Sequence, residues 1–302
     1  MIVTGTCSWA EKTLVRSGEF YPREANTAEA RLRYYAGLFG AVEVDSTFYA
    51  LPDMRNAALW AERTPARFIF HIKAYAALTG HGVAAKVLPK DLRDMLPKGD
   101  REKERIYIKD RDMRDAIARR FRDSVAPLKK AGKLGMMVFQ FPPWFHYGAA
   151  GLDYILECKE LMQGPDVAVE FRHGSWLAPG RAESVLGFLR ENGLVYVTAD
   201  EPQYGTLDTI PYMPRVTADI AYFRLHGRNT RNWLKKGVET SLRYDYFYSD
   251  KELKGFADDI RSVSRQAKTV HVMFNNCHGS SAVKNALKLM AILDEGSTPT
   301  GG

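Results

Sequence analysis

The stretch Val42-Glu43-Val44-Asp45-Ser46-Thr47-Phe48-Tyr49 decides the fold. Apolar and polar residues alternate over its first six positions, which is the period of a β-strand, so Glu43 and Asp45 leave the same face. Val42 and Val44 leave the opposite face, which must be covered by apolar groups. Two neighbouring carboxylates on a covered strand cost free energy unless they are paired, hydrogen-bonded or used. The stretch therefore predicts a buried strand that carries functional acids.

Strands and helices alternate along the rest of the chain. Seven further runs of apolar and β-branched residues have the length of buried strands, and apolar residues at helical spacing follow most of them. Capping boxes at Asn26–Glu29 and Ser249–Glu252 each predict the start of a helix. The predicted strands cover residues 2–7, 42–47, 68–73, 135–140, 167–172, 194–200, 220–226 and 269–274.

Eight strands, each followed by a helix or a long insertion, indicate an α/β fold of the TIM-like (β/α)8 barrel type. A doubly wound open sheet shows the same alternation, but no Gly-rich phosphate fingerprint follows the first strand. We expect a single barrel domain over residues 1–295, with a charged insertion after the third strand at about 86–112. Residues 296–302, rich in Gly, Ser, Thr and Pro, are expected to be disordered.

The composition is that of a globular protein, with 45% hydrophobic and 26% charged residues. No apolar run approaches the roughly 18 residues that span a bilayer, so we expect no membrane partner. No basic and apolar leader of the secretory kind is visible. The cysteines, Cys7, Cys158 and Cys277, are odd in number and lack C-x-x-C spacing, which argues against disulfides and structural zinc and favours a cytoplasmic location.

The net charge of +7 is concentrated in one region. Residues 86–133 contain 16 Lys and Arg against 9 Asp and Glu, and the rest of the chain is neutral. A local excess of this kind is typical of a surface that meets an anion. The alternating signs of residues 101–105 equally fit a solvated, salt-bridged insertion.

Polar residues fall at the predicted ends of seven consecutive strands, from the second to the eighth. The carboxyl ends of the strands form the active face of such a barrel, so we expect these side chains to line one ligand pocket. They are Glu43, Asp45, Lys73, Gln140, Glu170, Arg172, Asp200, Arg224, His226, Asn275 and Asn276. Each also has a structural explanation, since Glu170 and Arg172 could simply pair and His226 could be a core histidine.

A metal site is the less favoured alternative. Carboxylate and imidazole ligands could come from Glu43, Asp45, Glu170, Asp200 and His226. Lys73, Arg172 and Arg224 would share the same mouth and repel a divalent ion. We therefore expect no metal ion and no other cofactor.

The loop after the seventh strand is basic and aromatic. Arg224, His226, Arg228 and Arg231 lie where barrels often hold phosphate, and the arginine fork matches phosphate geometry. Basic and aromatic residues alternate in this loop, as on surfaces that bind nucleic acid by neutralising phosphates and stacking bases. They are Trp233, Lys235, Lys236, Tyr244 and Tyr246. The tyrosines at 244, 246 and 248 could equally form a core strand. The expected partner is an anionic small molecule or a nucleic acid.

Several motifs together resemble one known family. They are Gly5-Thr6-Cys7-Ser8-Trp9, Phe20-Tyr21-Pro22, the stretch 42–49, Phe139-Gln140-Phe141-Pro142-Pro143, Glu170-Phe171-Arg172, Arg224-Leu225-His226-Gly227-Arg228 and Phe274-Asn275-Asn276. In order and over nearly the whole chain they resemble the YecE-like family (domain of unknown function 72). The family more often has Asn at the position of Asp45 and Gly at that of Ser8. The resemblance implies a TIM-like barrel and supplies no established reaction, so it assigns no catalytic role.

The leading hypothesis is an enzyme, a hydrolase or a lyase, that uses acid–base chemistry on a phosphorylated or nucleic-acid-derived substrate. Glu43 and Glu170 would be the acid and base, with Asp200 assisting. Lys73 and His226 would stabilise negative charge. Arg172, Arg224 and Arg228 would hold the anion, and Asp45, Gln140, Asn275 and Asn276 would complete the substrate site.

Two alternatives remain open from the sequence. A non-catalytic protein could bind nucleic acid through residues 86–133 and 228–248. A scaffold would instead pair its polar strand ends with one another and leave no open cavity. The oligomeric state is not predicted.

Overall fold

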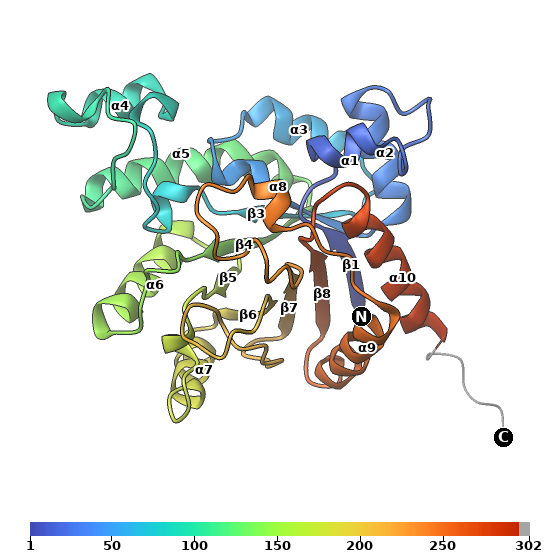
Figure 1. The fold of residues 1–302 in the computed structure, drawn as a ribbon. Helices are drawn as coiled ribbons and strands as arrows, with labels where there is room; N and C mark the ends of the chain where they lie inside the picture. The colour runs from blue at the N-terminus through green and yellow to red at the C-terminus, as the bar shows by residue number, and fades with distance from the viewer. Residues whose placement is uncertain (296–302) are drawn as a thin grey trace.

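Eight parallel strands close into a barrel in which each strand is hydrogen-bonded to the next and β8 to β1 (Figure 1). The computed structural model describes residues 1–295, and the tail 296–302, expected to be disordered, lies outside them. The strands are β1 Ile2–Thr6, β2 Ala41–Val44, β3 Ile69–Lys73, β4 Leu134–Gln140, β5 Val167–Glu170, β6 Val195–Asp200, β7 Ile220–Leu225 and β8 Thr269–Phe274. The predicted TIM-like barrel is confirmed.

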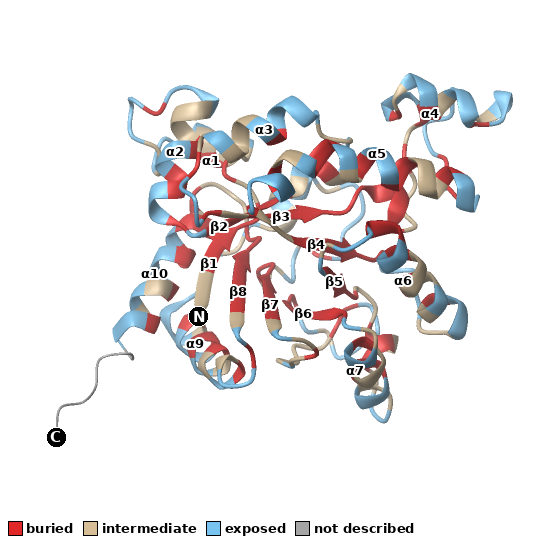
Figure 2. Ribbon diagram, turned by 180° about the vertical axis from the view of Figure 1, so that it is seen from behind, coloured by how far each residue is buried: buried red, intermediate tan, exposed pale blue. Residues whose placement is uncertain are grey.

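Helices surround the barrel and turn their buried faces toward it (Figure 2). They are α1 Lys12–Ser17, α2 Ala28–Leu38, α3 Met54–Glu62, α4 Lys90–Met95, α5 Arg111–Lys130, α6 Ala149–Met162, α7 Ala182–Glu191, α8 Thr240–Arg243, α9 Asp250–Ser264 and α10 Ser281–Glu295. Ser249 and Glu252 form the predicted capping box of α9. In α2 the capping residue is Thr27, not Asn26, and its side chain accepts from the Ala30 amide. No helix within residues 1–295 has both the length and the apolar character to cross a bilayer.

The connection from β3 to α5, residues 74–110, carries α4 to the outer edge of the molecule (Figure 1). Three short 3-10 turns, η2 Ala76–Leu78, η3 Ala85–Val87 and η4 Lys98–Asp100, lie in it. An isolated antiparallel bridge joins Val83 to Ile106 and closes the base of this excursion. Arg120 of α5 holds Asp91 of α4 by an ion pair. The charged segment therefore projects from the barrel wall and is fastened to α5.

One apolar cluster shows which side chains point into the barrel. Its buried members are Cys7, Ala41, Met136, Val138, Ala168, Val195, Val197, Tyr222 and Met273. Residues of nearly every strand can meet only in the barrel interior. Because side chains alternate along a strand, residues two positions further along, such as Glu43 and Arg224, also face inward. Gly5 permits the close approach of β1 and β2, since a Cβ there would lie 2.1 Å from the Ala41 carbonyl oxygen.

The second strand is shorter than predicted. It ends at Val44, and Asp45–Phe48 form a 3-10 turn, η1, so the strand expected over 42–47 is wrong at its end. The Thr47 hydroxyl contacts the carbonyl oxygens of Val44 at 2.7 Å and of Lys73 at 2.6 Å. The Thr47 side chain thus contacts backbone carbonyl oxygens at the ends of β2 and β3, where a longer β2 would have made backbone hydrogen bonds instead. The turn still leaves Asp45 beside Glu43 at the barrel mouth.

Candidate functional site

The floor of the barrel mouth is built around Arg224, the fifth residue of β7. Its Nε and Nη2 donate to the two oxygens of Glu43 at 3.0 and 2.6 Å, and its Nη1 donates to Oε2 of Glu170 at 2.5 Å. The Tyr222 hydroxyl donates to Glu43 Oε2 at 2.9 Å. All of these side chains are buried. The arginine therefore bridges carboxylates from two strands that lie on different sides of the barrel.

Asp45 and Lys73 lie nearer the opening. Nη2 of Arg224 approaches Oδ1 of Asp45 at 3.3 Å, and Lys73 Nζ lies 3.5 Å from the same oxygen. The Asp45 side chain is 25% exposed, whereas those of Glu43 and Arg224 are fully buried. Burial lowers the pKa of Lys73, but Asp45, Tyr244 and Glu43 together outweigh it, and the net pKa lies above its ordinary value. Solvent thus reaches the cluster at Asp45.

Glu170 also accepts hydrogen bonds from three side chains at the ends of β4, β5 and β7. Its Oε1 accepts from Gln140 Nε2 at 2.7 Å, from Arg172 Nη1 at 3.0 Å and from His226 Nε2 at 3.0 Å. Asn275 Nδ2 lies 2.9 Å from His226 Nδ1. The ring of His226 is therefore held with its proton on Nε2 and with Nδ1 as acceptor.

Burial and charge set the protonation of these groups. Burial alone would raise the pKa of Glu170, but Arg224, His226 and Arg172 hold it well below its ordinary value. Burial lowers the pKa of His226 to about 3, so this imidazole is neutral. Burial raises the pKa of Glu43 to about 7, against the attraction of Arg224 and with the repulsion of Asp45. Glu170 is thus a permanent anion, and Glu43 titrates near neutrality.

Glu201 is a member of the site that the sequence reasoning missed. Its Oε2 lies 3.0 Å from Arg172 Nε, and its Oε1 accepts from the Ile210 amide at 2.8 Å. Burial raises the pKa of Glu201 to about 7, opposed by Arg172. Glu201 follows Val195 and Val197 at even spacing, so it continues the inward face of β6.

Asp200 and Arg228 form a separate group. Asp200 leaves the opposite face of β6 and binds Arg228 through both of its oxygens, with a shortest distance of 2.7 Å. The Tyr248 hydroxyl also donates to Asp200 at 2.7 Å, and Arg228 Nη1 reaches Glu252 of α9 at 3.3 Å. Within residues 1–295 no side-chain hydrogen bond or ion pair joins Asp200 or Arg228 to the side chains of Arg224 and Glu170. The structure therefore does not bring Asp200 and Arg228 to the mouth.

Asn276 is likewise turned away from Asn275. Its Nδ2 donates to the Tyr246 carbonyl oxygen and to Asn285 Oδ1 of α10, both at 2.9 Å. It joins the loop after β7 to α10. We call the residues that do converge the mouth cluster: Glu43, Asp45, Lys73, Gln140, Glu170, Arg172, Glu201, Arg224, His226 and Asn275.

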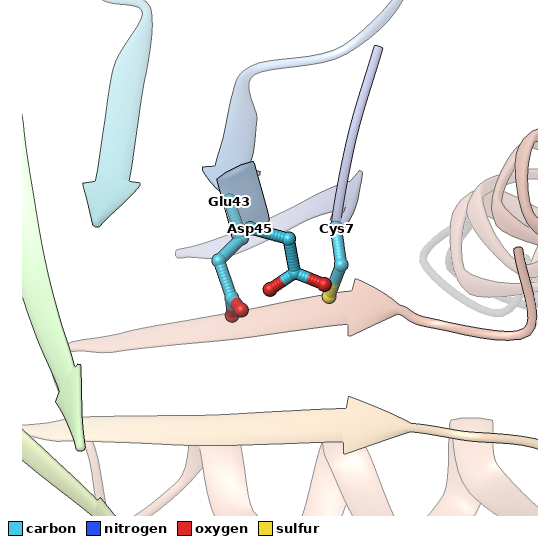
Figure 3. Close-up of side chains that lie close together, drawn as sticks. All are labelled: Cys7, Glu43 and Asp45. Carbon is cyan, nitrogen blue, oxygen red and sulfur yellow. The ribbon is translucent and has the colours of Figure 1, made fainter. Parts of the chain in front are cut away.

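Cys7 lies beside Glu43 and Asp45 of the mouth cluster, and these three residues are the one group with metal-ligand geometry found within residues 1–295. The ligand atoms of Cys7, Glu43 and Asp45 lie within 4.8 Å of one another, and Figure 3 shows the three side chains converging from β2, the turn after it and the end of β1. Nη2 of Arg224 already contacts all three, including the Cys7 sulfur at 3.7 Å. Burial also raises the pKa of Cys7 well above its ordinary value, which keeps the thiol protonated. This set therefore fits a guanidinium better than a divalent ion.

Aromatic rings border the mouth cluster on two sides. On one side His81 packs edge-on against Phe48, with centroids 4.9 Å apart, and against Trp144 at 5.5 Å. On the other, Trp233 and Tyr244 pack edge-on at 5.5 Å. Trp144 is 57% exposed. We call these five residues the aromatic rim. The ring of Trp144 offers an exposed face on which a planar or sugar ring can lie, whereas Trp233 is 4% exposed and the Arg172 guanidinium lies over its ring at 5.0 Å.

Seven of the 16 cations in the basic region 86–133 form ion pairs within the part of the chain that the structure describes. Its ion pairs include Lys86–Glu104, Arg101–Asp94, Lys103–Asp100, Arg120–Asp91 and Arg119–Asp115. Arg111 and Arg114 pair with Glu160 and Glu157 of α6. These contacts agree with the salt-bridged interpretation of the insertion.

Comparison with known proteins gives one consistent result. A family model described as "Protein of unknown function DUF72" matches residues 3–301. The UPF0759 protein YunF of Bacillus subtilis (strain 168) is 32% identical over 298 residues, which are 97% of this chain and 95% of that protein. The crystal structure of a DUF72 family protein (TM1631) from Thermotoga maritima MSB8 matches with a TM-score of 0.75 and 32% identity, covering 97% and 99% of the two chains. A DUF72 family protein (EF0366) from Enterococcus faecalis V583 matches with a TM-score of 0.77 and 27% identity, covering 97% and 96%.

Proposed function

The chain belongs to the DUF72 family, and we propose that it is an enzyme that carries out acid–base chemistry at the mouth of its barrel. The proposed substrate is a small phosphorylated or nucleic-acid-derived molecule, and the reaction is that of a hydrolase or a lyase. The observation that carries the proposal is a surplus of one carboxyl over the cations in the mouth cluster. The carboxyls are Glu43, Asp45, Glu170 and Glu201, and the cations are Lys73, Arg172 and Arg224.

The surplus keeps a proton at the site. If all of these groups were ionised, a buried cluster would carry an uncompensated negative charge, which is costly. Glu43 and Glu201, each with a pKa of about 7, are the groups that take up the proton. A carboxyl whose pKa lies near the working pH is a suitable general acid or base.

Asp45 is the carboxyl placed to meet the substrate. It is the most exposed acid of the cluster, and its oxygen lies within 4.8 Å of an oxygen of the fully buried Glu43. We assign proton exchange with the substrate to Asp45 and proton storage to Glu43, whose pKa the neighbouring Asp45 carboxylate helps to raise. Glu170, held ionised, positions Arg224, Arg172 and His226.

Lys73 and Arg172 hold the anionic group in this proposal. Within residues 1–295 the contacts of the Lys73 ammonium are limited to Asp45 at 3.5 Å and the Phe48 ring at 4.8 Å. Nη2 of Arg172 has no partner within residues 1–295. Burial, together with the positive charges of Lys73 and Arg172, lowers the pKa of His81 to about 4, which is consistent with both cations lying near this ring. A phosphate oxygen there would complete both donors.

The aromatic rim supports a substrate that contains a ring. The rings of Trp144 and Trp233 belong to loops after β4 and β7, so they flank the mouth cluster from different strands. Stacking on the exposed ring of Trp144 would contribute about 1–3 kcal/mol per base and tolerate many ring types. A nucleotide or a sugar phosphate combines the ring and the anion that this arrangement accepts.

Calorimetric binding of inorganic phosphate, ribose 5-phosphate and adenosine 5′-monophosphate tests the site. Lys73→Met should weaken binding of all three at least about tenfold, since a charged hydrogen bond contributes about 1.5–3 kcal/mol. Lys103→Met is the matched control, because Lys103 is exposed and pairs with Asp100 in the insertion. Equal affinities of the two variants would place the anion elsewhere and contradict the proposal.

A nucleic-acid-binding protein without chemistry is the second candidate. Arg231, Lys235 and Lys236 are exposed and have no ion pair within the described chain, and Trp233 lies between them. A scaffold role would be expected to pair the polar strand ends, and the ion pairs of Arg224 meet that expectation. The exposed Asp45 and the incompletely bonded Lys73 and Arg172 are what favour a ligand site over a scaffold.

The cysteines bear on the proposed location. Cys7, Cys158 and Cys277 are all free, and the first two are buried. Free thiols persist in a reducing compartment, which supports the cytoplasmic location that we propose.

A further inference from the structure

A cavity lies at the end of the barrel opposite the mouth cluster, below the N-terminal ends of the strands. It has a volume of about 740 Å³ and reaches between β3, β4, β7 and β8. Apolar side chains form most of its wall, namely Val3, Ile69, Leu134, Met136 and Ile220. Cavities of 300–1,000 Å³ with apolar walls and few polar groups are typical of small-molecule sites. This cavity is separated from the mouth cluster by the packed interior of the barrel.

One buried polar side chain lines the cavity. His271 of β8 is 6% exposed, and its Nδ1 lies 3.1 Å from Nε2 of His71. The backbone amide of Met136 donates to Nδ1 of His71 at 3.0 Å. Gly135 makes room for this arrangement, because a Cβ there would lie 2.6 Å from the His71 Nδ1.

The Met136 amide determines where both imidazole protons lie. Nδ1 of His71 must accept, so a neutral His71 carries its proton on Nε2 and donates to Nδ1 of His271. His271 then carries its own proton on Nε2. Burial lowers the pKa of His71 well below its ordinary value and that of His271 to about 4, so both rings are neutral. The Nε2–H of His271 has no hydrogen-bond partner within residues 1–295.

Cations stand at the opening of the same cavity. Arg67 and Lys129 line it, both are exposed, and neither takes part in an ion pair within the described chain. Asp166 is the one acidic residue among the lining residues. The cavity therefore combines an inner donor, an apolar wall and a net positive opening.

We propose that this cavity binds a small apolar organic anion, whose inner acceptor oxygen takes a hydrogen bond from His271 Nε2 and whose charged group lies at the opening near Arg67 and Lys129. An apolar wall excludes purely polar metabolites, because their remaining polar groups would lose hydration without gaining partners. A buried donor selects a ligand with an acceptor at the matching depth. The site is independent of the proposed function at the mouth.

The probe that matches this description is 4-benzoylbenzoate, which carries a ketone oxygen, two apolar rings and a carboxylate. The matched compound 4-benzylbenzoate lacks only the ketone oxygen. We expect the ketone to bind wild type about five- to tenfold more tightly than the benzyl compound, and His271→Phe to remove that difference. Arg67→Met/Lys129→Met should weaken both compounds.

Photolabelling with the same ketone locates its binding site, because an irradiated benzophenone forms covalent bonds with nearby C–H groups of the protein. Labelling should fall on peptides that contain Met136 or Ile220 and should be lost in Ile220→Trp, which fills the cavity. Melting curves of each variant show whether it is folded. Labelling at the barrel mouth, equal affinity of wild type for the two compounds, or absence of binding by folded wild type would each overturn the proposal.

Discussion

Arg224 and Glu43 form an ion pair with two hydrogen bonds inside the barrel, Nε to Oε2 at 3.0 Å and Nη2 to Oε1 at 2.6 Å. Both side chains are fully buried, and the third nitrogen of the same guanidinium binds Glu170. One cation thus holds two carboxylates that arise 127 positions apart in the sequence. The mouth cluster is organised around this arginine.

The first prediction concerns stability. Arg224→Met should lower the free energy of unfolding by about 3–5 kcal/mol, because it leaves Glu43 and Glu170 buried without their counterion. Arg119→Met is the control, since it removes an exposed pair with Asp115 and should cost at most about 1 kcal/mol. Urea unfolding measures both. Similar losses in the two variants would mean that the buried pairs do not hold the barrel mouth together.

The second prediction separates two neighbouring acids. Glu201→Gln removes a carboxylate beside Arg172, which frees that guanidinium and should tighten phosphate binding several-fold. Asp200→Asn weakens the contact with Arg228 and Tyr248, so it should lower stability and leave phosphate affinity unchanged. Calorimetry and urea unfolding give the two readouts. An equal effect of both substitutions on phosphate affinity would show that Asp200 belongs to the site after all.

The third prediction concerns pH. The pKa of Glu43 is about 7 in the folded chain against an ordinary value of 4.5, so the folded state binds this proton more tightly than the unfolded state. The resulting stabilisation is fully present below about pH 4.5 and is lost as the pH rises through 7. Glu43→Gln cannot titrate there and should lose this fall in stability between pH 5 and 8.

Urea unfolding at several pH values measures that slope. Glu104→Gln is the control, because Glu104 is exposed in the insertion and should keep the wild-type slope. Glu201 contributes a fall in the same direction, so some slope remains in Glu43→Gln. A slope equal to that of wild type would contradict the protonation assigned to Glu43.

The fourth prediction distinguishes a small-molecule site from a nucleic-acid surface. Binding of adenosine 5′-monophosphate should depend only weakly on salt and should not change in Lys235→Gln/Lys236→Gln. A protein that binds single-stranded nucleic acid along the loop after β7 would instead show an affinity that falls steeply with salt concentration, and these substitutions would reduce that dependence. Fluorescence titration of an oligonucleotide at several salt concentrations measures the slope. Tight, steeply salt-dependent oligonucleotide binding would favour the non-catalytic alternative.

The barrel could be predicted because its strands are buried on both faces and read as apolar, β-branched runs. The end of β2 could not, because Asp45, Ser46 and Thr47 continue the alternation of a strand and also have the side chains of a turn. The turn is stabilised by a hydrogen bond from the Thr47 hydroxyl to the backbone carbonyl of Lys73, which belongs to another strand. Such a contact has no signature in local sequence.

The residues that line the barrel mouth could be predicted only in part, because the orientation of a strand in the barrel also has no signature in local sequence. When both faces of a strand are apolar, the sequence does not show which face points inward. Asp200 was therefore chosen where Glu201 faces the mouth, and Asn276 was grouped with Asn275 although it binds Asn285 of α10. Val195 and Val197 face the barrel interior, and Glu201 lies at even spacing from them. If the inward face of β6 could be read from the sequence, that spacing would identify Glu201 as the residue at the mouth.

The most direct measurement is turnover. Sugar phosphates and mononucleotides are incubated with wild type, Asp45→Asn, Glu43→Gln and Lys103→Met, and products are followed by phosphorus and proton NMR. We expect wild type and Lys103→Met to convert at least one of these compounds. In Asp45→Asn the rate of conversion should fall at least about a hundredfold. Unchanged conversion in folded Asp45→Asn, or no conversion of any compound that wild type binds at Lys73, would contradict the proposed function.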